Sequence, residues 1–386
     1  MKDSALKIKN IPIALPSLGS EELEAIKEPL LNGWLTQGPQ VAKFEKEFRK
    51  LHNVKHAMAT TSCTSALHLA LVSMGIGPGD EVIVPAFTWV STANVVLYCG
   101  AKPVFCDVDT KTFNIKVSDI SSKITNKTKA IIPVHLFGLC ADVDSIKKVT
   151  PKHVKLLEDA ACAAGASYKN KYAGSLLDMG AFSFHPRKSI TCGEGGMLTT
   201  NNNELNKIAE KLRNHGAEIP EEKRHLGSKP FILPDFNVLG FNYRMTDLQA
   251  AVGTVQLSKL GNFVKERERW ARYYTEKLAK LDWLIPQTIP EYVTQHSWQA
   301  YVCYVNPQKA PKSRNKIMEE LQSKGISTRP GTHAVHMLGF YKEKYGFTPE
   351  DFPGAYACDQ NTMAIPLHNK LSKDDYAYIV EALYEL

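Results

Sequence analysis

The sequence predicts an α/β protein with a large domain, whose mainly parallel central sheet is flanked by helices, and a smaller C-terminal α+β domain. Short apolar runs alternate with helical patterns through the first two-thirds of the 386 residues, as is typical of parallel sheets with crossover helices. A long helical pattern from Thr246 then leads into a region that mixes strand and helix patterns. We therefore expect residues 1–260, including an N-terminal segment, to form the large domain and residues 261–386 the small one.

Seven apolar runs are expected to be strands of the large domain. They cover residues 54–60, 81–85, 103–108, 129–135, 154–159, 181–184 and 197–200. Helical patterns lie between several of them, for example over 64–74 and 91–100. Because parallel strands of such a sheet bind ligands beyond their carboxyl ends, residues that directly follow these runs are candidates for a site.

The C-terminal third predicts one strand and three helices. The long helix extends from Thr246 through the DLQAAVGTVQLSKL pattern toward ERERWARYYTEKLAKL. Residues 297–307 alternate like a half-buried strand, and 313–325 predict a helix that ends at Gly325. The last fifteen residues form an amphipathic pattern with Ser372 as a possible cap.

Composition is ordinary for a globular enzyme, with 44% apolar and 23% charged residues. The chain has no uncharged apolar run of about 18 residues and no signal-peptide pattern, so we expect a cytoplasmic protein without a membrane span. The net charge of +7 is dispersed; it suits an anionic small substrate and does not require nucleic acid. Eight cysteines lack metal-ligand spacing, and Cys99, Cys106 and Cys162 are interpreted as small core residues.

Residues 60–71, TTSCTSALHLAL, pass from a strand into a helix that is expected to begin at about Thr64. The free N–H groups and dipole of a helix N-terminus bind phosphate, and Ser62, Thr64 and Ser65 offer hydroxyl donors. N-capping alone is the alternative explanation for these residues. In the segment 154–166 a strand ends at Glu158-Asp159 and small residues follow, so the acid is placed to meet a ligand nitrogen or, alternatively, to cap a turn.

Residues 183–197, SFHPRKSITCGEGGM, place Lys188 between an apolar strand and a glycine-rich turn. Pro186 indicates a loop, and the glycines from Gly193 to Gly196 allow the backbone to approach a ligand closely. A desolvated lysine here would lose its proton near neutral pH and act as a nucleophilic amine. A solvated loop lysine is the ordinary alternative.

Taken together, these segments supply a phosphate site, an acid for a ring nitrogen and an amine for a Schiff base, which are the requirements of pyridoxal 5′-phosphate (PLP). Trp89 is suited to stack on the ring, although a core position is the alternative. His333, His336 and His368 do not form a metal pattern, so we expect no metal. A GxSxG elbow and a dinucleotide fingerprint are also missing from the sequence.

Eight stretches, which include the segments above, occur in order along nearly the whole chain: LNGWLTQGPQVAKFEKEF, SCTSALHLALVSMGIGPGDEVIVPAFTWVSTANVV, GAKPVFCDVD, PVHLFG, EDAACAAGA, SFHPRKSITCGEGGM, GFNYRMTDLQAAVGTVQL and ISTRPGTHAVHM. With them the chain resembles the sugar-nucleotide aminotransferases of the DegT/DnrJ type, which belong to the fold type I PLP-dependent enzymes. The resemblance implies that Lys188 is the Schiff-base lysine and shuttles the proton. It also implies that Asp159 meets the pyridine nitrogen and that Trp89 stacks on the ring.

The resemblance further implies the groups that hold the phosphate. Ser183 and the backbone around Cys63 and Thr64 match phosphate ligands. Asn242, in GFNYR, matches an asparagine that reaches the phosphate bound by the neighbouring subunit, which implies a homodimer with shared active sites. Many relatives have Gly-Thr in place of Cys63-Thr64, so the Cys63 side chain is expected to point away from the phosphate.

Two further sets of residues are placed near the ring and the substrate by the same resemblance. Many relatives carry Gln or His where this chain has Cys162, a position that often touches the phenolic oxygen; because a thiol is a weak donor, we expect that contact to be missing or replaced by water. Arg329, His333 and His336 match a region near the substrate. Arg329 is a candidate for the diphosphate, with a surface or interdomain ion pair as the alternative. His185 is placed in the loop or against the substrate.

The function implied by the resemblance is amino transfer from L-glutamate to a keto group, with C4 favoured over C3, of a 6-deoxy sugar linked to UDP, dTDP or GDP. The cofactor would alternate between PLP and its amine form, PMP, and the product would serve surface polysaccharide, O-antigen or lipopolysaccharide synthesis. One alternative is a PLP-dependent sugar dehydratase, in which a histidine replaces the lysine; Lys188 argues against it. Another is a non-catalytic PLP-fold sensor. Regulators of this fold usually carry an added DNA-binding domain, which we do not expect before Leu31.

Overall fold

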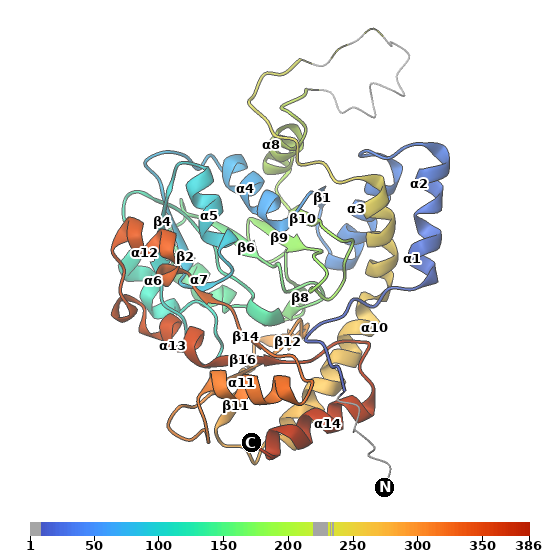
Figure 1. Ribbon diagram of the computed structural model, residues 1–386. Coiled ribbons are helices and arrows are strands. Elements are labelled where there is room, and N and C mark those ends of the chain that lie inside the picture. The colour runs from blue at the N-terminus through green and yellow to red at the C-terminus, as the bar shows by residue number, and fades with distance from the viewer. Residues whose placement is uncertain (1–8, 219–230, 232, 234) are drawn as a thin grey trace.

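A computed structural model describes residues 9–218, 231, 233 and 235–386 (Figure 1). Its largest sheet has seven strands in the order β1-β10-β9-β6-β5-β2-β4. Their bounds are β1 His56–Thr60, β10 Gly196–Thr200, β9 Met179–Ser183, β6 Lys155–Asp159, β5 Thr128–Ile131, β2 Glu81–Pro85 and β4 Lys102–Cys106. Within this sheet, β10 is antiparallel to both of its neighbours and the remaining strands share one direction. The predicted α/β fold with a mainly parallel sheet is confirmed.

Helices cover both faces of this sheet, and β2 shows why its strands are apolar throughout. Val82 and Val84 join a core cluster with residues of α4 and α5, whereas Ile83 joins a different cluster with residues of α6 and α7. Successive side chains of a strand point to opposite faces, so a strand covered on both sides needs apolar residues at every position. The described α-helices are α1 Ser20–Ala25, α2 Lys27–Asn32, α3 Pro39–His52, α4 Cys63–Ser73, α5 Ser91–Tyr98, α6 Val117–Lys123, α7 Val143–Val149, α8 Asn203–Arg213, α10 Asp247–Lys277, α11 Arg314–Ser323, α12 Gly339–Tyr345, α13 Pro353–Asn361 and α14 Lys373–Tyr384.

A second, antiparallel sheet lies below the first in Figure 1 and is built from the C-terminal third of the chain. Its order is β11 Leu284–Pro286, β13 Tyr301–Val305, β16 Thr362–Ile365 and β14 Arg329–Pro330. The strand predicted over 297–307 is therefore shorter than expected. Small sheets also form between β12 Val293–Gln295, β7 Ser167–Tyr168 and β8 Lys171–Tyr172, and between β15 His333–Ala334 and β3 Phe87–Thr88.

Helix α10 runs beside both sheets in Figure 1 and begins with a capping box. The Thr246 hydroxyl accepts a hydrogen bond from Gln249 N, and the Gln249 side chain accepts one from Thr246 N. The next residue, Asp247, is buried and accepts backbone N–H bonds from the start of α3, including one from Gly38 over 2.8 Å. This carboxylate therefore fixes α3 against α10. The domain boundary predicted near residue 260 falls inside α10, which is continuous there, and it stays a prediction.

Both predicted C-terminal helices form, and the cap predicted at Ser372 is confirmed. Ser313 Oγ accepts a hydrogen bond from Lys316 N at the start of α11, and Ser372 forms a capping box with Asp375 at the start of α14. In the described part of the chain, no helix is long and apolar enough to cross a membrane.

Candidate active site

The three segments singled out in the sequence meet at one edge of the large sheet. Asp159, the last residue of β6, pairs with Ala181 of β9. Ser183, the last residue of β9, pairs with Gly196 of β10, which in turn pairs with Thr60 of β1. The carboxyl ends of β1, β6 and β9 therefore bring the acid, the lysine loop and the start of α4 together.

The start of α4 lies directly on β10. A Cβ atom on Gly196 would lie 2.4 Å from the backbone carbon and oxygen of Ser62 and 2.6 Å from Cys63 N, so only glycine allows this approach. Ser62 Oγ accepts a hydrogen bond from Ser65 N, which confirms the capping role, and Thr64 donates to Ser91 Oγ over 3.0 Å. Capping occupies one N–H, so the other N–H groups at the N-terminus remain suited to a phosphate.

Asp159 is a buried carboxylate without a basic partner in the described residues. Its Oδ2 accepts a hydrogen bond from Thr92 Oγ1 over 2.8 Å and its Oδ1 accepts one from Ala161 N over 3.1 Å. Burial raises the pKa of Asp159, and these two hydrogen bonds oppose that rise. The bond to Ala161 is the turn cap of the alternative interpretation. No basic side chain forms an ion pair with Asp159 in the described residues, so its carboxyl group is available to a cationic ring nitrogen, which would favour the ionised form.

Lys188 is half-buried, so it is not a solvated loop lysine. Its Nζ donates a hydrogen bond to Cys162 Sγ over 3.1 Å. Burial lowers the pKa of Lys188, as the sequence argument expects. Cys162, Cys63 and Asp159 together raise this pKa by more than burial lowers it, so the pKa of Lys188 lies above its usual value. The expectation of a neutral amine is therefore corrected for the chain without cofactor, because the sequence does not show which groups lie around the amine.

Trp89 is 58% exposed, which excludes the alternative of a core residue. Its ring lies 5.6 Å from the ring of His333, tilted by 45°, because β3 and β15 pair. Cys162 is half-buried and joins no core cluster of the described residues, so the interpretation of it as a core residue is wrong. Cys99 is partly buried and packs against the core, and Cys106 is buried as expected. The exposed indole leaves an aromatic face available to a planar ligand.

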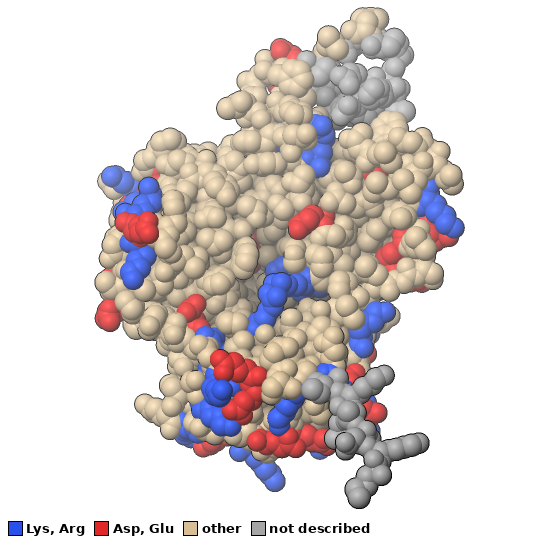
Figure 2. Space-filling view, in the orientation of Figure 1, with Lys and Arg blue, Asp and Glu red and all other residues tan. Residues whose placement is uncertain are grey.

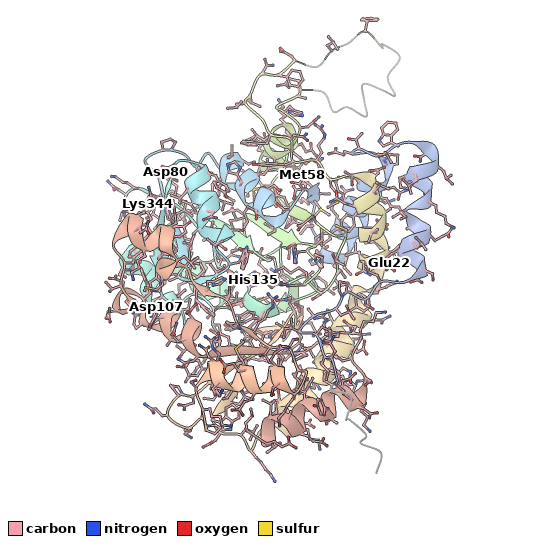
Figure 3. The ribbon with its side chains drawn as sticks, in the orientation of Figure 1. Glu22, Met58, Asp80, Asp107, His135 and Lys344 are labelled. Atoms are coloured by element: carbon pink, nitrogen blue, oxygen red, sulfur yellow. The ribbon has the colours of Figure 1, made fainter. Side chains whose placement is uncertain are left out.

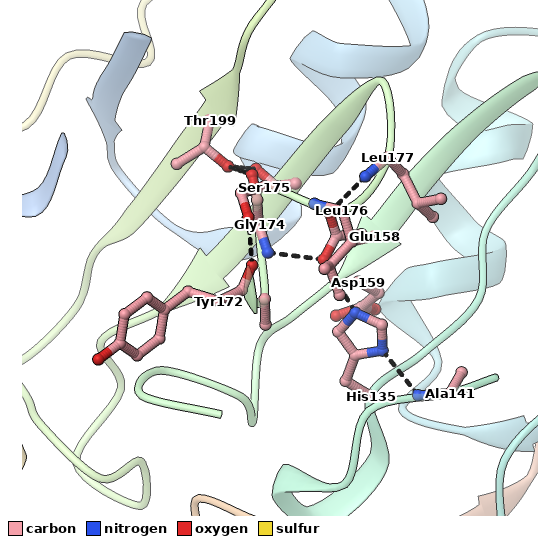
Figure 4. Close-up of polar contacts among 12 residues, drawn as sticks. His135, Ala141, Glu158, Asp159, Tyr172, Gly174, Ser175, Leu176, Leu177 and Thr199 are labelled. Carbon is pink, nitrogen blue, oxygen red and sulfur yellow. Dashed lines mark hydrogen bonds and ion pairs between the residues drawn. The ribbon is translucent and has the colours of Figure 1, made fainter. Parts of the chain in front are cut away.

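Beside Asp159, a second buried acid has a structural role (Figure 4). Glu158 accepts backbone N–H bonds from Gly174, Leu176 and Leu177 over 2.6 to 2.9 Å, and His135 Nε2 lies 2.9 Å from it. Since His135 Nδ1 accepts a bond from Ala141 N, the ring is assigned as neutral with its proton on Nε2. Glu158 therefore holds in place the loop that contains Gly174, Leu176 and Leu177. His135 lies near the centre of the molecule in Figure 3.

Basic side chains gather beside the hollow in the middle of the face shown in Figure 2. Arg329 is exposed over much of its surface. The partial burial of its side chain and the nearby charge of Arg187 both lower its pKa. No ion pair joins Arg329 to a carboxylate among the described residues, which disfavours the ion-pair alternative. His185 is half-buried in the same loop, where its Nδ1 accepts a hydrogen bond from Arg187 N over 3.3 Å.

Of the other predicted positions, His333 and Asn242 are exposed, and Ser183 is buried with its hydroxyl 3.4 Å from His185 N. His336 is fully buried with its ring 4.9 Å from that of Phe352, so the structure corrects its expected place beside the substrate. The apolar residues around His336 draw it into the core. The structure does not bring His333, His336 and His368 together, and the described residues hold no group of metal ligands.

The residues at this edge fit PLP. The buried carboxyl group of Asp159, which forms no ion pair within the described residues, suits a protonated ring nitrogen; Trp89 offers a ring face, and the start of α4 with Ser183 offers phosphate donors. Lys188 is the amine within this set. The buried thiol of Cys63 has a pKa well above its usual value, through burial and the nearby Asp159, so it stays neutral.

Sequence reasoning missed Thr92 and Arg267, and it placed Arg187, like His185, in the loop or against the substrate without a role. Thr92 lies one helical turn after Trp89 in the stretch FTWVSTAN, and that spacing was a usable indication. Arg267 occupies a position in the apolar series of α10 that includes Leu260, Val264 and Ala271. A charged residue at a core position of a helix requires a partner or a ligand, and this was the pattern that could have revealed it.

Comparisons with known proteins agree with this site. Residues 16–384 match the model of the DegT/DnrJ/EryC1/StrS aminotransferase family. The spore coat polysaccharide biosynthesis protein SpsC of Bacillus subtilis is 38% identical over 378 residues, covering 97% of each chain. The GDP-perosamine synthase of Caulobacter vibrioides is 38% identical over 378 residues, covering 97% of this chain and 98% of the other.

Among solved structures, the protein Spr1654 of Streptococcus pneumoniae in its PMP form superposes with a TM-score of 0.90 at 30% identity, over 97% of this chain and 98% of that one. The PLP form of the same protein gives a TM-score of 0.88 at 31% identity, with the same coverage. The fold therefore accommodates both forms of the cofactor.

Proposed function

The chain belongs to the DegT/DnrJ/EryC1/StrS aminotransferase family, and from this premise we propose that it moves an amino group from L-glutamate to the C4 keto group of a nucleotide-linked 6-deoxy sugar. It is a PLP-dependent sugar aminotransferase of polysaccharide biosynthesis. The relative named for GDP-perosamine supports a 4-amino-6-deoxy sugar as the product. O-antigen or lipopolysaccharide is the proposed destination of that sugar.

The observation that carries the proposal is the grouping of Lys188, Asp159 and Trp89 at one sheet edge. PLP, when bound, supplies an electron sink that makes the carbon bearing the amino group acidic. In this arrangement the amine of Lys188 holds the cofactor and carries the proton at Nζ. Asp159 keeps a negative charge opposite the ring nitrogen, and Trp89 covers one face of the ring and excludes water there.

The proposed phosphate contacts come from the start of α4 and from Ser183. Thr64 Oγ1 is already oriented by its hydrogen bond to Ser91, so little side-chain freedom is lost when it meets an anion. Arg329 and the neighbouring Arg187 repel each other and lack carboxylate partners in the described residues. A sugar-linked diphosphate would relieve this repulsion, because each guanidinium can bond to phosphate oxygens.

The proposed homodimer rests on residues that a single chain leaves uncovered. Asn242 is exposed, and Leu31 and Leu239 are 87% and 91% exposed. Large exposed apolar side chains commonly mark an interface. If Asn242 reaches the phosphate of the other subunit, a hybrid of Lys188→Ala and Asn242→Ala chains contains one intact site and one doubly defective site. Such hybrids should recover activity that neither parent has; hybrids without recovery would contradict the shared site.

The substrate is tested directly with a panel of 4-keto and 3-keto sugars linked to UDP, dTDP and GDP. Each is incubated with the enzyme, PLP and L-glutamate, and the aminated carbon of the product is identified by NMR. We expect a 4-amino-6-deoxy product. Amination at C3, or amino transfer from another donor but not from glutamate, would overturn the corresponding part of the proposal.

A further inference from the structure

A small polar pocket opens beside Lys188, between α10, the lysine loop and the N-terminal segment. Its lining residues are Ala14, Leu15, Pro16, Ser17, Pro186, Arg187, Lys188, Ser189, Thr191, Gln256, Arg267, Gln299 and Asn369. Three of them are basic and none is acidic. Positive charge that no acidic lining residue balances indicates a site for a small anion.

Arg267 is the buried base of this pocket, only 6% exposed. Its Nε donates to Asn369 Oδ1 over 2.9 Å, and its Nη1 donates to the carbonyl oxygens of Trp298, Gln299 and Leu367 over 3.1 to 3.3 Å. All of these acceptors are neutral, and Nη2 donates to no residue in the described part of the chain. Burial accordingly lowers the pKa of Arg267 to about 10, which still leaves it charged at neutral pH.

Ser189 supplies a second, independent observation at the same place. It is 6% exposed, and its hydroxyl has no hydrogen-bond partner among the described residues. Buried hydroxyls are almost always bonded, because leaving one unpaired costs free energy. Ser189 directly follows Lys188 in the chain and lines the same pocket as Arg267.

Two acids lie near this pocket, and neither forms an ion pair with Arg267 in the described residues. Glu266, the preceding residue of α10, favours the charged form of Arg267, but its carboxylate accepts a hydrogen bond from Asn369 Nδ2 over 2.8 Å rather than from the guanidinium. Glu22 lies between α1 and α10 (Figure 3), where it accepts hydrogen bonds from Gln256 Nε2 over 2.8 Å and from Lys259 Nζ over 2.7 Å. Glu22 is therefore paired with Lys259, which also pairs with Glu21, and the hydrogen bonds lower the pKa of Glu22 despite its burial. No carboxylate of the described residues bonds directly to the guanidinium of Arg267.

From this arrangement we infer that Arg267 and Ser189 bind the α-carboxylate of the amino donor. The inference rests on the proposed function and assigns the donor subsite. In an α-amino acid the carboxylate and the transferred amine are attached to the same carbon, so the carboxylate must bind next to the reacting amine of Lys188. A nucleotide sugar carries its diphosphate several bonds away from its keto carbon, which suits the exposed Arg329 rather than this enclosed pocket.

The test follows the donor half-reaction of the PLP-loaded enzyme by the absorbance change from the aldehyde to the amine form of the cofactor. L-glutamate is compared with L-isoglutamine, in which the α-carboxylate is an amide. The wild type should strongly prefer glutamate. Arg267→Gln should raise the half-saturating glutamate concentration by about 10- to 100-fold and narrow the preference by a similar factor. Ser189→Ala should raise the half-saturating glutamate concentration, and reduce the preference for glutamate over L-isoglutamine, by about 3- to 10-fold.

The second half-reaction separates binding from a general defect. The amine form of Arg267→Gln should react with the keto-sugar nucleotide at the wild-type half-saturating concentration. Arg329→Gln should instead raise the half-saturating concentration of the keto-sugar nucleotide and leave that of glutamate at the wild-type value. The matched control is Arg272→Gln. Arg272 is an exposed arginine of the same helix and pairs with Glu268, so its replacement should change neither half-reaction.

An unchanged preference for glutamate in Arg267→Gln would overturn the inference while amino transfer itself stands. If Arg267→Gln does not fold, Ser189→Ala decides, and an unchanged preference there has the same meaning. No cofactor conversion by the wild type with any amino donor would instead refute the proposed function.

Discussion

Lys188 Nζ donates a hydrogen bond to Cys162 Sγ over 3.1 Å, and this thiol belongs to the segment that follows Asp159. The contact joins the lysine loop to the end of β6 before any ligand is considered. It also gives the lysine a neighbour that favours its charged form. The amine is therefore both fixed in place and held protonated in the cofactor-free chain.

Replacing Cys162 should make Lys188 easier to deprotonate. Among the groups that raise the pKa of Lys188, Cys162 acts most strongly, so Cys162→Ala should lower that pKa. The rate of acetylation of Lys188 in the cofactor-free protein, followed against pH by peptide mass spectrometry, reports the change. The midpoint should move to lower pH than in the wild type. A midpoint that stays or rises would show that the thiol does not act on the amine.

Lys188→Ala should abolish amino transfer without unfolding the protein, since the side chain lies in a loop and supports no strand or helix. The measurement pairs product formation with a thermal melt. Reduction of the wild type with borohydride in the presence of PLP, followed by peptide mapping, should label Lys188. Full activity of the variant, or a label on a different lysine, would contradict the assignment.

Asp159→Asn should weaken PLP binding by about 100-fold or more, because it removes one member of a buried charge pair. Thr92→Val removes the hydrogen bond that orients the carboxylate, together with the contact to the Thr88 hydroxyl, and should weaken PLP binding by about 3- to 10-fold. Titration of each cofactor-free variant with PLP, followed by absorbance, gives the affinities. Equal affinities for Asp159→Asn and the wild type would exclude Asp159 as the partner of the ring nitrogen.

Glu158→Gln should lower the free energy of unfolding by about 1–3 kcal/mol, since an amide nitrogen would then face backbone N–H donors that now have a carboxylate. Urea unfolding measures the change. The exposed Glu204→Gln is the control and should stay within about 0.5 kcal/mol of the wild type. A Glu158→Gln variant as stable as this control would show that the buried network is not stabilising.

Acid should destabilise the protein through its buried histidines. Burial lowers the pKa of His52 to about 4 and that of His296 to about 3, from an ordinary value of 6.5. The unfolded state takes up protons first as the pH falls, so the stabilisation is present above pH 6.5 and is lost as the pH falls toward 4. For His52 the loss from pH 7.5 to pH 5 is about 2 kcal/mol. His52→Gln should show a correspondingly flatter dependence of unfolding free energy on pH; an equally steep one would exclude His52.

Much of the fold followed from local patterns. The strands around 81–85, 154–159 and 197–200 appear within two residues of their expected bounds, because apolar runs between turn residues have few other stable conformations. The cap at Ser372 and the start of α10 at Thr246 also follow from short-range hydrogen bonds. The burial of His336 did not follow, since it depends on contact with Phe352, sixteen positions away along the chain.

The sequence by itself determined the α/β class and the group formed by Lys188, Asp159 and the start of α4, because these residues directly follow or precede the elements that carry them. Only the tertiary structure decided the charge environment of Lys188 and the partners of Arg267. Both depend on groups more than twenty residues apart along the chain, brought together by strand order and by the packing of α10. Electrostatic effects act through space over a few ångströms, so linear spacing does not reveal them.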